Sequence, residues 1–403
     1  MDDVMVTEVR RRMAYERART TPPEDFPKLP DLPLGRYTHP VMFEAEQELL
    51  RRSWLFAGHV SEFGAPGSYR VLDIPLAPII VARGSDGVLR GFLNACRHRG
   101  APVVREVAGT ARLLVCQYHS WSYDLTGRLV HVPDERDFVG LQAEERALTP
   151  VRCESWGGFV FVNLDQGAAP LEEWLAPITR RLPEIAAAPL RVVDRSSYEV
   201  RCNWKIMAEG FLEVYHAKTI HPRTVAQLLD PSGAVMELYP NGHTGMITPY
   251  LDSVAREGRD TVIGIPRIAG LGDIFWTSNP AFGLFPNLIT PLEASGFPFL
   301  VFWPLAVDRT LLEIVWFGTD WGDGPRPEEW ERRLDAFSAV MDEDRRNLEP
   351  IQGSVEAAAH AGIPLNYQER RIWHFHATLD KAIKITLPEE LRVPDLLRAY
   401  VED

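Results

Sequence analysis

Two short stretches, Cys96-Arg97-His98-Arg99-Gly100 and Cys116-Gln117-Tyr118-His119-Ser120-Trp121, carry most of the information about the fold. Each pairs one cysteine with one histidine, and 17 residues separate His98 from Cys116. Thiolate sulfur and imidazole nitrogen are ligands for zinc and for iron–sulfur clusters. The pattern therefore predicts a metal site held by Cys96, His98, Cys116 and His119.

Two kinds of metal site suit these four ligands. One is a tetrahedral zinc ion, and the other is a two-iron cluster with the cysteines on one iron and the histidines on the other. Zinc sites usually separate paired ligands by two to four residues, so the single residue between Cys96 and His98 favours the cluster. Neutral imidazoles in place of two thiolates raise the potential of such a cluster, which suits a one-electron relay.

The sequence around this site predicts an α+β chain in three parts. Residues 1–40 predict a helix and a proline-rich arm, and residues 41–164 predict a small all-β domain of short strands separated by Gly, Pro and Asp. Within residues 165–403, helical segments alternate with strands, including a hairpin around Val307-Asp308-Arg309. This pattern favours an antiparallel sheet wrapped by helices.

The amino-acid composition of the chain limits the kinds of molecule that it is expected to bind. The chain has 403 residues, 45% of them hydrophobic and 25% charged, which is typical of a globular protein. Its formal charge of −13 disfavours a nucleic acid or an anionic membrane as the main partner. No apolar run is long enough to span a bilayer, and Met1–Thr20 lacks the apolar core of a signal peptide, so we expect a cytoplasmic protein. The sequence has no glycine-rich dinucleotide fingerprint and no Walker-type loop.

A second group of candidate ligands lies in Glu209-Gly210-Phe211-Leu212-Glu213-Val214-Tyr215-His216-Ala217-Lys218-Thr219-Ile220-His221-Pro222. We predict a helix from Trp204 to about Thr219, which would put Glu209, Glu213 and His216 on one face. Because a residue before proline avoids α geometry, His221 can turn back toward His216. Two histidines and one carboxylate form the facial triad that holds iron and leaves positions open for oxygen.

The spacing of residues does not identify which carboxylate is the third ligand of this triad. The sequence predicts one or two terminal helices within Glu328 to Ala359, and this segment carries Asp342, Glu343 and Asp344 in succession. Any of the three carboxylates could complete the site.

Together these motifs resemble those of the Rieske non-heme iron aromatic-ring-hydroxylating oxygenases, specifically their catalytic (alpha) subunits. The resemblance extends to Asn203-Trp204-Lys205, to Phe285-Pro286-Asn287, and to a late motif with Glu369, His374, Phe375 and Thr378. Family members usually have Gly at the position of Ser120 and Asn at the position of Gly210. The resemblance implies a Rieske [2Fe–2S] domain, a helix-grip catalytic domain with an antiparallel sheet, and a homotrimer, with a beta subunit as an option.

The resemblance also implies roles for single residues. Cys96, His98, Cys116 and His119 would hold the cluster, and Asp344, rather than Asp342 or Glu343, would join His216 and His221 on a mononuclear Fe(II). Glu213 would link His119 of one subunit to His216 of its neighbour through hydrogen bonds. Electrons would come from NAD(P)H through a separate reductase, a ferredoxin or both, and O2 would be the co-substrate.

The expected reaction is hydroxylation of an aromatic or other hydrophobic small molecule, as in aromatic hydrocarbon catabolism, and oxidative N- or O-demethylation is the alternative. Apolar candidates for the substrate pocket are Met207, Phe211, Leu212, Phe282, Phe285 and Trp303. Two further classes stay open: a zinc-binding non-redox protein, and an electron-transfer protein with a vestigial second domain.

Overall fold

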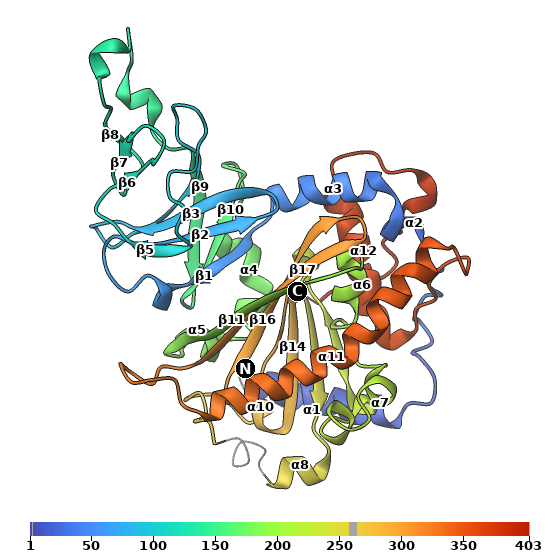
Figure 1. Cartoon of the computed structure of the whole chain (residues 1–403). Coiled ribbons are helices and arrows are strands. Elements are labelled where there is room, and N and C mark those ends of the chain that lie inside the picture. The colour runs from blue at the N-terminus through green and yellow to red at the C-terminus, as the bar shows by residue number, and fades with distance from the viewer. Residues whose placement is uncertain (2, 258–263, 403) are drawn as a thin grey trace. The chain divides into compact units, whose positions relative to one another are not determined.

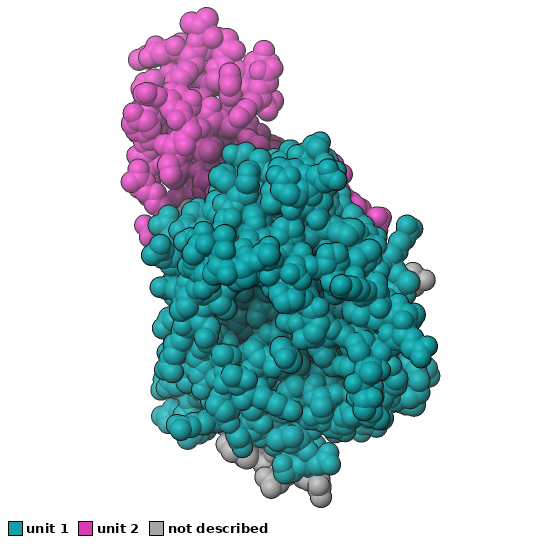
Figure 2. Space-filling view, turned by 90° about the vertical axis from the view of Figure 1, so that its right-hand side faces the viewer, with its two compact units in different colours: residues 1–49, 174–403 teal, residues 50–173 magenta. Residues whose placement is uncertain are grey.

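The structure, a computed structural model, describes residues 1, 3–257 and 264–402 (Figure 1). It divides into two compact units, one of residues 50–173 and one of residues 1–49 and 174–403 (Figure 2). The N-terminal segment up to Leu49 therefore packs with the C-terminal part of the chain. In the described residues, no helix has both the length and the apolar character needed to cross a membrane.

The unit of residues 50–173 is built from two antiparallel sheets. The larger has the strand order β1-β10-β9-β4-β3-β2-β5, and the smaller is β6-β7-β8. The strands are β1 (Leu55–His59), β2 (Ser68–Ile74), β3 (Ala77–Arg83), β4 (Leu89–Leu93), β5 (Ala108–Thr110), β6 (Leu114–Val115), β7 (Ser122–Tyr123), β8 (Leu129–His131), β9 (Pro150–Trp156) and β10 (Phe159–Asn163). The structure thus has the predicted arrangement of short strands around the two Cys/His loops.

The other unit contains one seven-stranded antiparallel sheet in the order β11-β17-β16-β15-β14-β13-β12. Its strands are β11 (Leu190–Val200), β12 (Val235–Leu238), β13 (Thr244–Pro249), β14 (Ser278–Leu284), β15 (Leu288–Pro291), β16 (Phe297–Ala306) and β17 (Arg309–Thr319). Strands β16 and β17 pair from Phe297 opposite Phe317 to Ala306 opposite Arg309, which confirms the predicted hairpin.

Helices surround this sheet, and Figure 1 shows the long α11 lying beside its strands. The α-helices are α1 (Asp3–Ala18), α2 (Gly35–Thr38), α3 (Pro40–Arg51), α4 (Leu171–Thr179), α5 (Pro183–Ala187), α6 (Trp204–Glu209), α7 (Ala217–Ile220), α8 (Asp252–Glu257), α10 (Ile274–Thr277), α11 (Glu329–Glu356) and α12 (Arg370–Ala382). The sequence predicted one or two helices within Glu328 to Ala359, and the structure has one helix there, α11. The α+β fold class is therefore confirmed.

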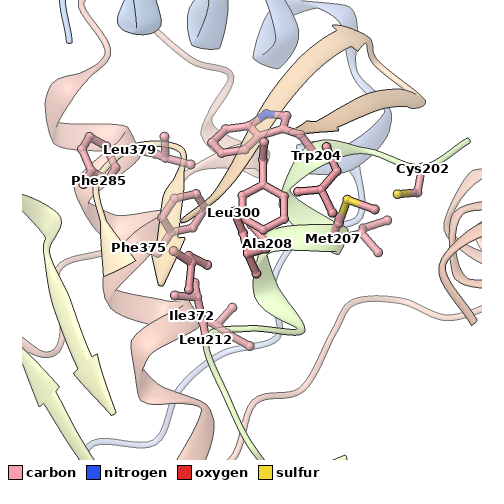
Figure 3. Close-up of a cluster of buried hydrophobic side chains, with 14 of the residues drawn as sticks. Cys202, Trp204, Met207, Ala208, Leu212, Phe285, Leu300, Ile372, Phe375 and Leu379 are labelled. Carbon is pink, nitrogen blue, oxygen red and sulfur yellow. The ribbon is translucent and has the colours of Figure 1, made fainter. Parts of the chain in front are cut away.

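A hydrophobic cluster fixes α6 and α12 against the sheet (Figure 3). Trp204 and Met207 of α6 lie in it with Phe375 of α12 and Leu300 of β16, and all four side chains are less than 5% exposed. Burying a side chain of this size stabilises the fold by roughly 1.5–3 kcal/mol. This packing holds the end of α6, and with it the residues that follow toward His216.

Candidate functional site

The segment that carries the second ligand group is not one helix. Helix α6 ends at Glu209, and α7 begins only at Ala217. Between them, the Glu213 carboxylate accepts hydrogen bonds from the backbone N–H groups of Tyr215 and His216. Such side-chain acceptors compete with helical hydrogen bonds, which explains why the predicted helix from Trp204 to Thr219 was wrong. Glu209 consequently lies apart from Glu213 and His216.

His216, His221 and Asp344 come together in the structure. One ligand atom from each lies within 4.8 Å of the other two, and no other group of this kind occurs among the described residues. The Nε2 atom of His221 lies 2.9 Å from Asp344 Oδ1, and that of His216 lies 3.6 Å from the same oxygen. His221 follows α7 with a non-helical backbone, as expected before Pro222.

The structure separates the three successive carboxylates of α11. Asp344 faces both histidines, whereas Glu343 Oε2 lies 2.7 Å from Nδ1 of His221 and accepts a hydrogen bond of 2.6 Å from Thr224. Asp342 forms an ion pair with Arg345 at 2.7 Å, and its side chain is half exposed. Asp344 is thus the carboxylate of α11 that can share an ion with both histidines.

Each histidine is held through its other ring nitrogen. Glu213 bonds Nδ1 of His216, as Glu343 bonds Nδ1 of His221. Such carboxylate partners fix the orientation of an imidazole and make it a stronger metal ligand. Both Nε2 atoms are therefore left to face Asp344.

The electrostatics of the triad suit a cation. Burial opposes protonation of His216, but the Glu213 hydrogen bond and the Glu213 and Asp344 charges outweigh it and raise the pKa. The pKa of His221 is also raised, because Asp344 and Glu343 outweigh the cost of burial. A site that stabilises positive charge on its own histidines fits a metal ion.

A cavity of about 430 Å³ opens onto the triad. Its wall is mainly apolar and includes Phe211, Val214, Ala217, Val225, Leu228, Leu229, Met246, Ala281, Ile289, Pro291, Ala336, Phe337 and Val340. Beyond the triad, the polar residues of the wall are Glu213, Arg223, Thr224, Gln227, Asn279, Glu293 and Arg333, and Arg333 and Glu293 form an ion pair at 2.6 Å.

Of the six apolar residues suggested by sequence, Phe211 lines this cavity. Met207, Phe282 and Trp303 are buried in the core, and Leu212 and Phe285 line a separate small cavity. The apolar wall residues that sequence reasoning missed come from the segment between Val214 and Leu229 and from β13, β14, β15 and α11. The pattern of apolar residues in the strand sequences does not indicate which face of a strand lines a cavity.

The first four candidate ligands lie on two matching loops. Cys96 follows β4, and Cys116 follows β6; the backbone N–H of Cys96 bonds Ala101 O, and that of Cys116 bonds Trp121 O. The two thiols are buried and interact with each other, and the Nδ1 atoms of His98 and His119 lie 3.1 Å apart.

This arrangement fits two irons better than one zinc. A single ion needs all its ligand atoms close together, and these four do not form such a group in the described structure. The sulfurs pair with each other and the imidazole nitrogens pair with each other, as expected for cysteines on one iron and histidines on the other.

Ser120 occupies a backbone conformation that favours glycine. Its φ is 58°, in the left-handed region. The Ser122 hydroxyl donates a hydrogen bond of 3.0 Å to Ser120 O. This geometry explains why glycine is usual at this position of the motif, and why serine carries a modest conformational cost there.

Tyr123 contacts the sulfur side of this site. Its hydroxyl lies 3.3 Å from Cys96 Sγ and accepts a hydrogen bond of 2.9 Å from the backbone N–H of Arg97. A donor to a ligand sulfur stabilises the reduced, more negative cluster. We expect Tyr123→Phe to lower the midpoint potential by about 40 mV, the equivalent of one hydrogen bond of about 1 kcal/mol. Potentiometric titration followed by electron paramagnetic resonance would measure the shift, and an unchanged potential would contradict it.

A buried polar cluster surrounds Glu209, and sequence reasoning did not find it. Glu209 accepts a hydrogen bond of 2.9 Å from Tyr37 and lies 2.7 Å from Nε2 of His376. Nδ1 of His376 in turn accepts from Arg36 at 2.8 Å, so Nε2 carries the ring proton and donates to Glu209. The four residues come from α2, α6 and α12, which are far apart in sequence.

This cluster predicts a pH dependence of stability. Burial raises the pKa of Glu209 to about 8, although Tyr37 and Lys205 oppose the rise. Between the unfolded value of 4.5 and about 8, the unfolded chain ionises Glu209 and the folded chain does not, so this contribution to stability falls as pH rises. Thermal unfolding from about pH 5 to 8 should show a steeper loss in the wild type than in Glu209→Gln. Parallel curves would contradict this prediction.

Comparison with known proteins gives two family matches. Residues 53–148 match the family described as the Rieske [2Fe-2S] domain, and residues 188–385 match that described as the ring hydroxylating alpha subunit (catalytic domain).

Curated relatives include the glycine betaine monooxygenase oxygenase subunit of Pseudomonas aeruginosa (strain UCBPP-PA14), which is 27% identical over 369 residues, covering 82% of this chain and 83% of that protein. The carnitine monooxygenase oxygenase subunit of Acinetobacter pittii (strain PHEA-2) is 32% identical over 207 residues, covering 50% of this chain and 56% of that protein.

Solved structures share the fold. A quaternary ammonium Rieske monooxygenase with a bound inhibitor has a TM-score of 0.76 at 23% identity, covering 91% of this chain and 100% of that one. Naphthalene 1,2-dioxygenase from Rhodococcus sp. has a TM-score of 0.73 at 21% identity, covering 96% and 100%. With the two family matches, these relationships show that the chain belongs to the Rieske non-heme iron oxygenases as a catalytic alpha subunit, an O2-dependent oxidoreductase that uses a Rieske [2Fe–2S] cluster and a mononuclear iron.

Proposed function

We propose that His216, His221 and Asp344 hold the mononuclear iron, and that Cys96, Cys116, His98 and His119 hold the Rieske cluster. The shared approach of Asp344 Oδ1 to both Nε2 atoms supports the first assignment. The pairing of thiols with thiols and imidazoles with imidazoles supports the second. When bound, the iron supplies O2 activation with electrons that arrive through the cluster.

The chain's own residues prepare this site. Glu213 and Glu343 hold the two imidazoles by their Nδ1 atoms, so that neither ring rotates away. We further propose that Glu213 also accepts from His119 of a neighbouring subunit in a homotrimer. His119 is exposed, and the Glu213 side chain, although only 9% exposed itself, lies two residues from the exposed Tyr215, so a second copy could approach both positions.

The substrate we propose is a small hydrophobic molecule, aromatic or similar in shape, which is hydroxylated. The observation that carries this proposal is the mainly apolar cavity of about 430 Å³ on the open side of His216, His221 and Asp344. Such a cavity binds an apolar body by excluding water, and the polar side chains of its wall are available to orient the bound molecule. Reducing equivalents would reach the cluster from NAD(P)H through a separate reductase, a ferredoxin or both.

Oxidative demethylation of a quaternary ammonium compound is the second candidate. It is favoured by the glycine betaine monooxygenase relative, which matches over more than four fifths of both chains. A quaternary ammonium group is best recognised by a cage of Trp and Tyr rings. Phe211 and Phe337 are the aromatic residues in the cavity lining, which gives a weaker cage and favours the first candidate.

Metal analysis tests the assignment of the two sites. We expect about three irons and two sulfides per chain in anaerobically purified protein. Zinc without sulfide would contradict both assignments. Turnover with a surrogate reductase would then compare aromatic hydrocarbons with glycine betaine and carnitine. Oxidation of the charged compounds alone would overturn the hydrophobic substrate and favour demethylation.

A further inference from the structure

The cavity beside the triad has an ion pair in its wall. Arg333 of α11 and Glu293, which follows β15, both line the cavity, and Nη2 of Arg333 lies 2.6 Å from Oε2 of Glu293. Their side chains are only 9% and 15% exposed. Because water is largely excluded from this pair, a polar group of a ligand interacts with it more strongly than with a pair on the surface.

Arg333 is also held by an aromatic ring. Its Cζ atom lies 4.8 Å from the centroid of the Trp316 ring, in β17, where the cation is attracted by the ring. A guanidinium has five N–H donors, more than the pair with Glu293 uses, so Arg333 can donate to an acceptor in the cavity. The two contacts fix the side chain in advance, which lowers the entropy cost of binding a ligand.

The position of Arg333 on α11 sets its distance from the triad. Four residues of this helix line the cavity at intervals of four, three and four positions, which places them on one face: Arg333, Phe337, Val340 and Asp344. The two polar ends of this row lie about 16 Å apart along the helix axis, and the two residues between them are apolar. After contact distances at both ends, roughly 10 Å is left for the body of a bound molecule.

A further polar residue lies at the same end of the cavity as the ion pair. Asn279 of β14 also lines the cavity, and its Nδ2 donates a hydrogen bond of 3.0 Å to the backbone oxygen of Leu292, the residue before Glu293. The other arginine of the wall, Arg223, is exposed and follows His221 by two residues, so it belongs to the triad end. The end far from the triad therefore has its own polar group.

The charges at this far end favour a neutral ligand group over an ion. Glu293 balances the charge of Arg333, so a ligand carboxylate that approached Arg333 would meet a like charge beside it. A ligand ammonium group that approached Glu293 would meet the guanidinium in the same way. A neutral oxygen accepts a hydrogen bond from the guanidinium without this repulsion.

We propose that Arg333, paired with Glu293, binds a neutral oxygen acceptor, such as a hydroxyl group, at the end of the substrate farthest from the oxidised carbon. The substrate class is an elongated apolar molecule with an oxygen substituent roughly 10 Å from the point of oxidation. This inference rests on the proposed function, because it takes His216, His221 and Asp344 as the point of oxidation. Arg333 determines specificity and takes no part in the chemistry.

Binding of three biphenyls to the cluster- and iron-loaded protein, without O2 and at pH 7, tests this proposal. Equilibrium dialysis gives the dissociation constants. We expect 4-hydroxybiphenyl to bind about 10-fold more tightly than biphenyl, and biphenyl-4-carboxylate to bind no more tightly than biphenyl. Equal binding of biphenyl and 4-hydroxybiphenyl, tightest binding of the carboxylate, or no binding of any of the three would overturn the proposal.

Variants separate recognition by Arg333 from its contribution to packing. The double variant Arg333→Met/Glu293→Gln removes the donor without leaving a carboxylate unpaired, so the 10-fold preference should disappear while biphenyl binds as before. Glu293→Gln alone leaves the guanidinium unbalanced, and biphenyl-4-carboxylate should then bind about 10-fold more tightly than it binds the wild type. A preference that survives in the double variant would overturn the proposal, as would unchanged carboxylate binding in Glu293→Gln.

Arg332→Met is the matched control for these variants. Arg332 is the exposed neighbour of Arg333 and is not among the residues that line the cavity, so the wild-type order of binding should remain. Loss of the preference in Arg332→Met would show that net charge, and not Arg333, accounts for it.

Turnover separates failure of this inference from failure of the proposed function. Hydroxylation of naphthalene or biphenyl, without tighter binding of 4-hydroxybiphenyl, would overturn the role of Arg333 and leave the proposed function intact. Oxidation of glycine betaine and carnitine alone, with the expected order of biphenyl binding, would overturn the proposed function and leave the binding role of Arg333 intact.

Discussion

Replacing Asp344 by asparagine is expected to lower kcat/KM by at least about 100-fold, because the proposed iron loses its anionic ligand. The iron content should fall from about three to about two per chain, while the visible spectrum of the cluster stays unchanged. Asp344 Oδ1 lies 2.9 Å from one histidine Nε2 and 3.6 Å from the other, and among the described residues no other carboxylate forms a ligand group with both histidines. Iron analysis and steady-state kinetics measure both effects.

Two neighbouring variants serve as controls for this prediction. Asp342→Asn removes the same charge two residues earlier in α11. The carboxylate of Asp342 pairs with Arg345, so this variant should behave like the wild type. Glu343→Gln weakens the hold on His221 Nδ1 and should give an intermediate loss of iron affinity, about 10-fold. Equal losses in Asp342→Asn and Asp344→Asn would show that charge alone, and not ligation, accounts for the effect.

Glu213→Gln is expected to slow transfer of electrons from the reduced cluster by about 10- to 100-fold. The neutral amide keeps the shape of the side chain but removes the negative charge of the carboxylate. This carboxylate accepts hydrogen bonds from His216 Nδ1 and from two backbone N–H groups. Rapid mixing of the reduced protein with O2 and substrate would follow reoxidation of the cluster. Like Glu343→Gln, this variant should bind iron about 10-fold more weakly, so it is first loaded with Fe(II) to about three irons per chain, which separates slow transfer from loss of metal.

Glu209→Gln provides the matched control, four residues earlier. Glu209 bonds Tyr37 and His376, away from the triad. The cluster of this variant should therefore be reoxidised at a rate near that of the wild type. A normal rate in Glu213→Gln would contradict the proposed path through this carboxylate. Equal slowing in both variants would point to a general disturbance of the segment after α6.

The sequence predicted the features that depend on local pattern. The paired Cys/His loops and the two histidines around α7 are visible as motifs, and α11 and the β16–β17 hairpin follow from periodicity and turn residues. The break after Glu209 was missed, because it depends on one carboxylate capping two backbone N–H groups. The cavity-lining faces of β13, β14 and β15 could not be assigned either, since burial alone does not distinguish a cavity wall from a packed core.

The tertiary structure also supplied what spacing could not. Three successive residues of α11 each carry a carboxylate: Asp342, Glu343 and Asp344. Only the orientation of α11 relative to α7 gives these carboxylates different partners. The same holds for the cluster around Glu209, which joins residues more than 300 positions apart.

Helix α11 contributes residues to the cavity wall at regular intervals along its length. Asp344, Val340, Phe337 and Arg333 all line the cavity from this one helix. At 1.5 Å per residue, they lie about 6, 10 and 16 Å along the axis from Asp344. A bulkier residue at 340 would exclude atoms near the oxidation point, one at 337 would shorten the longest accepted molecule, and a change at 333 would alter its far end. The position of oxidation on a substrate could therefore be moved in steps of roughly one helical turn, without any change to the residues proposed to hold iron.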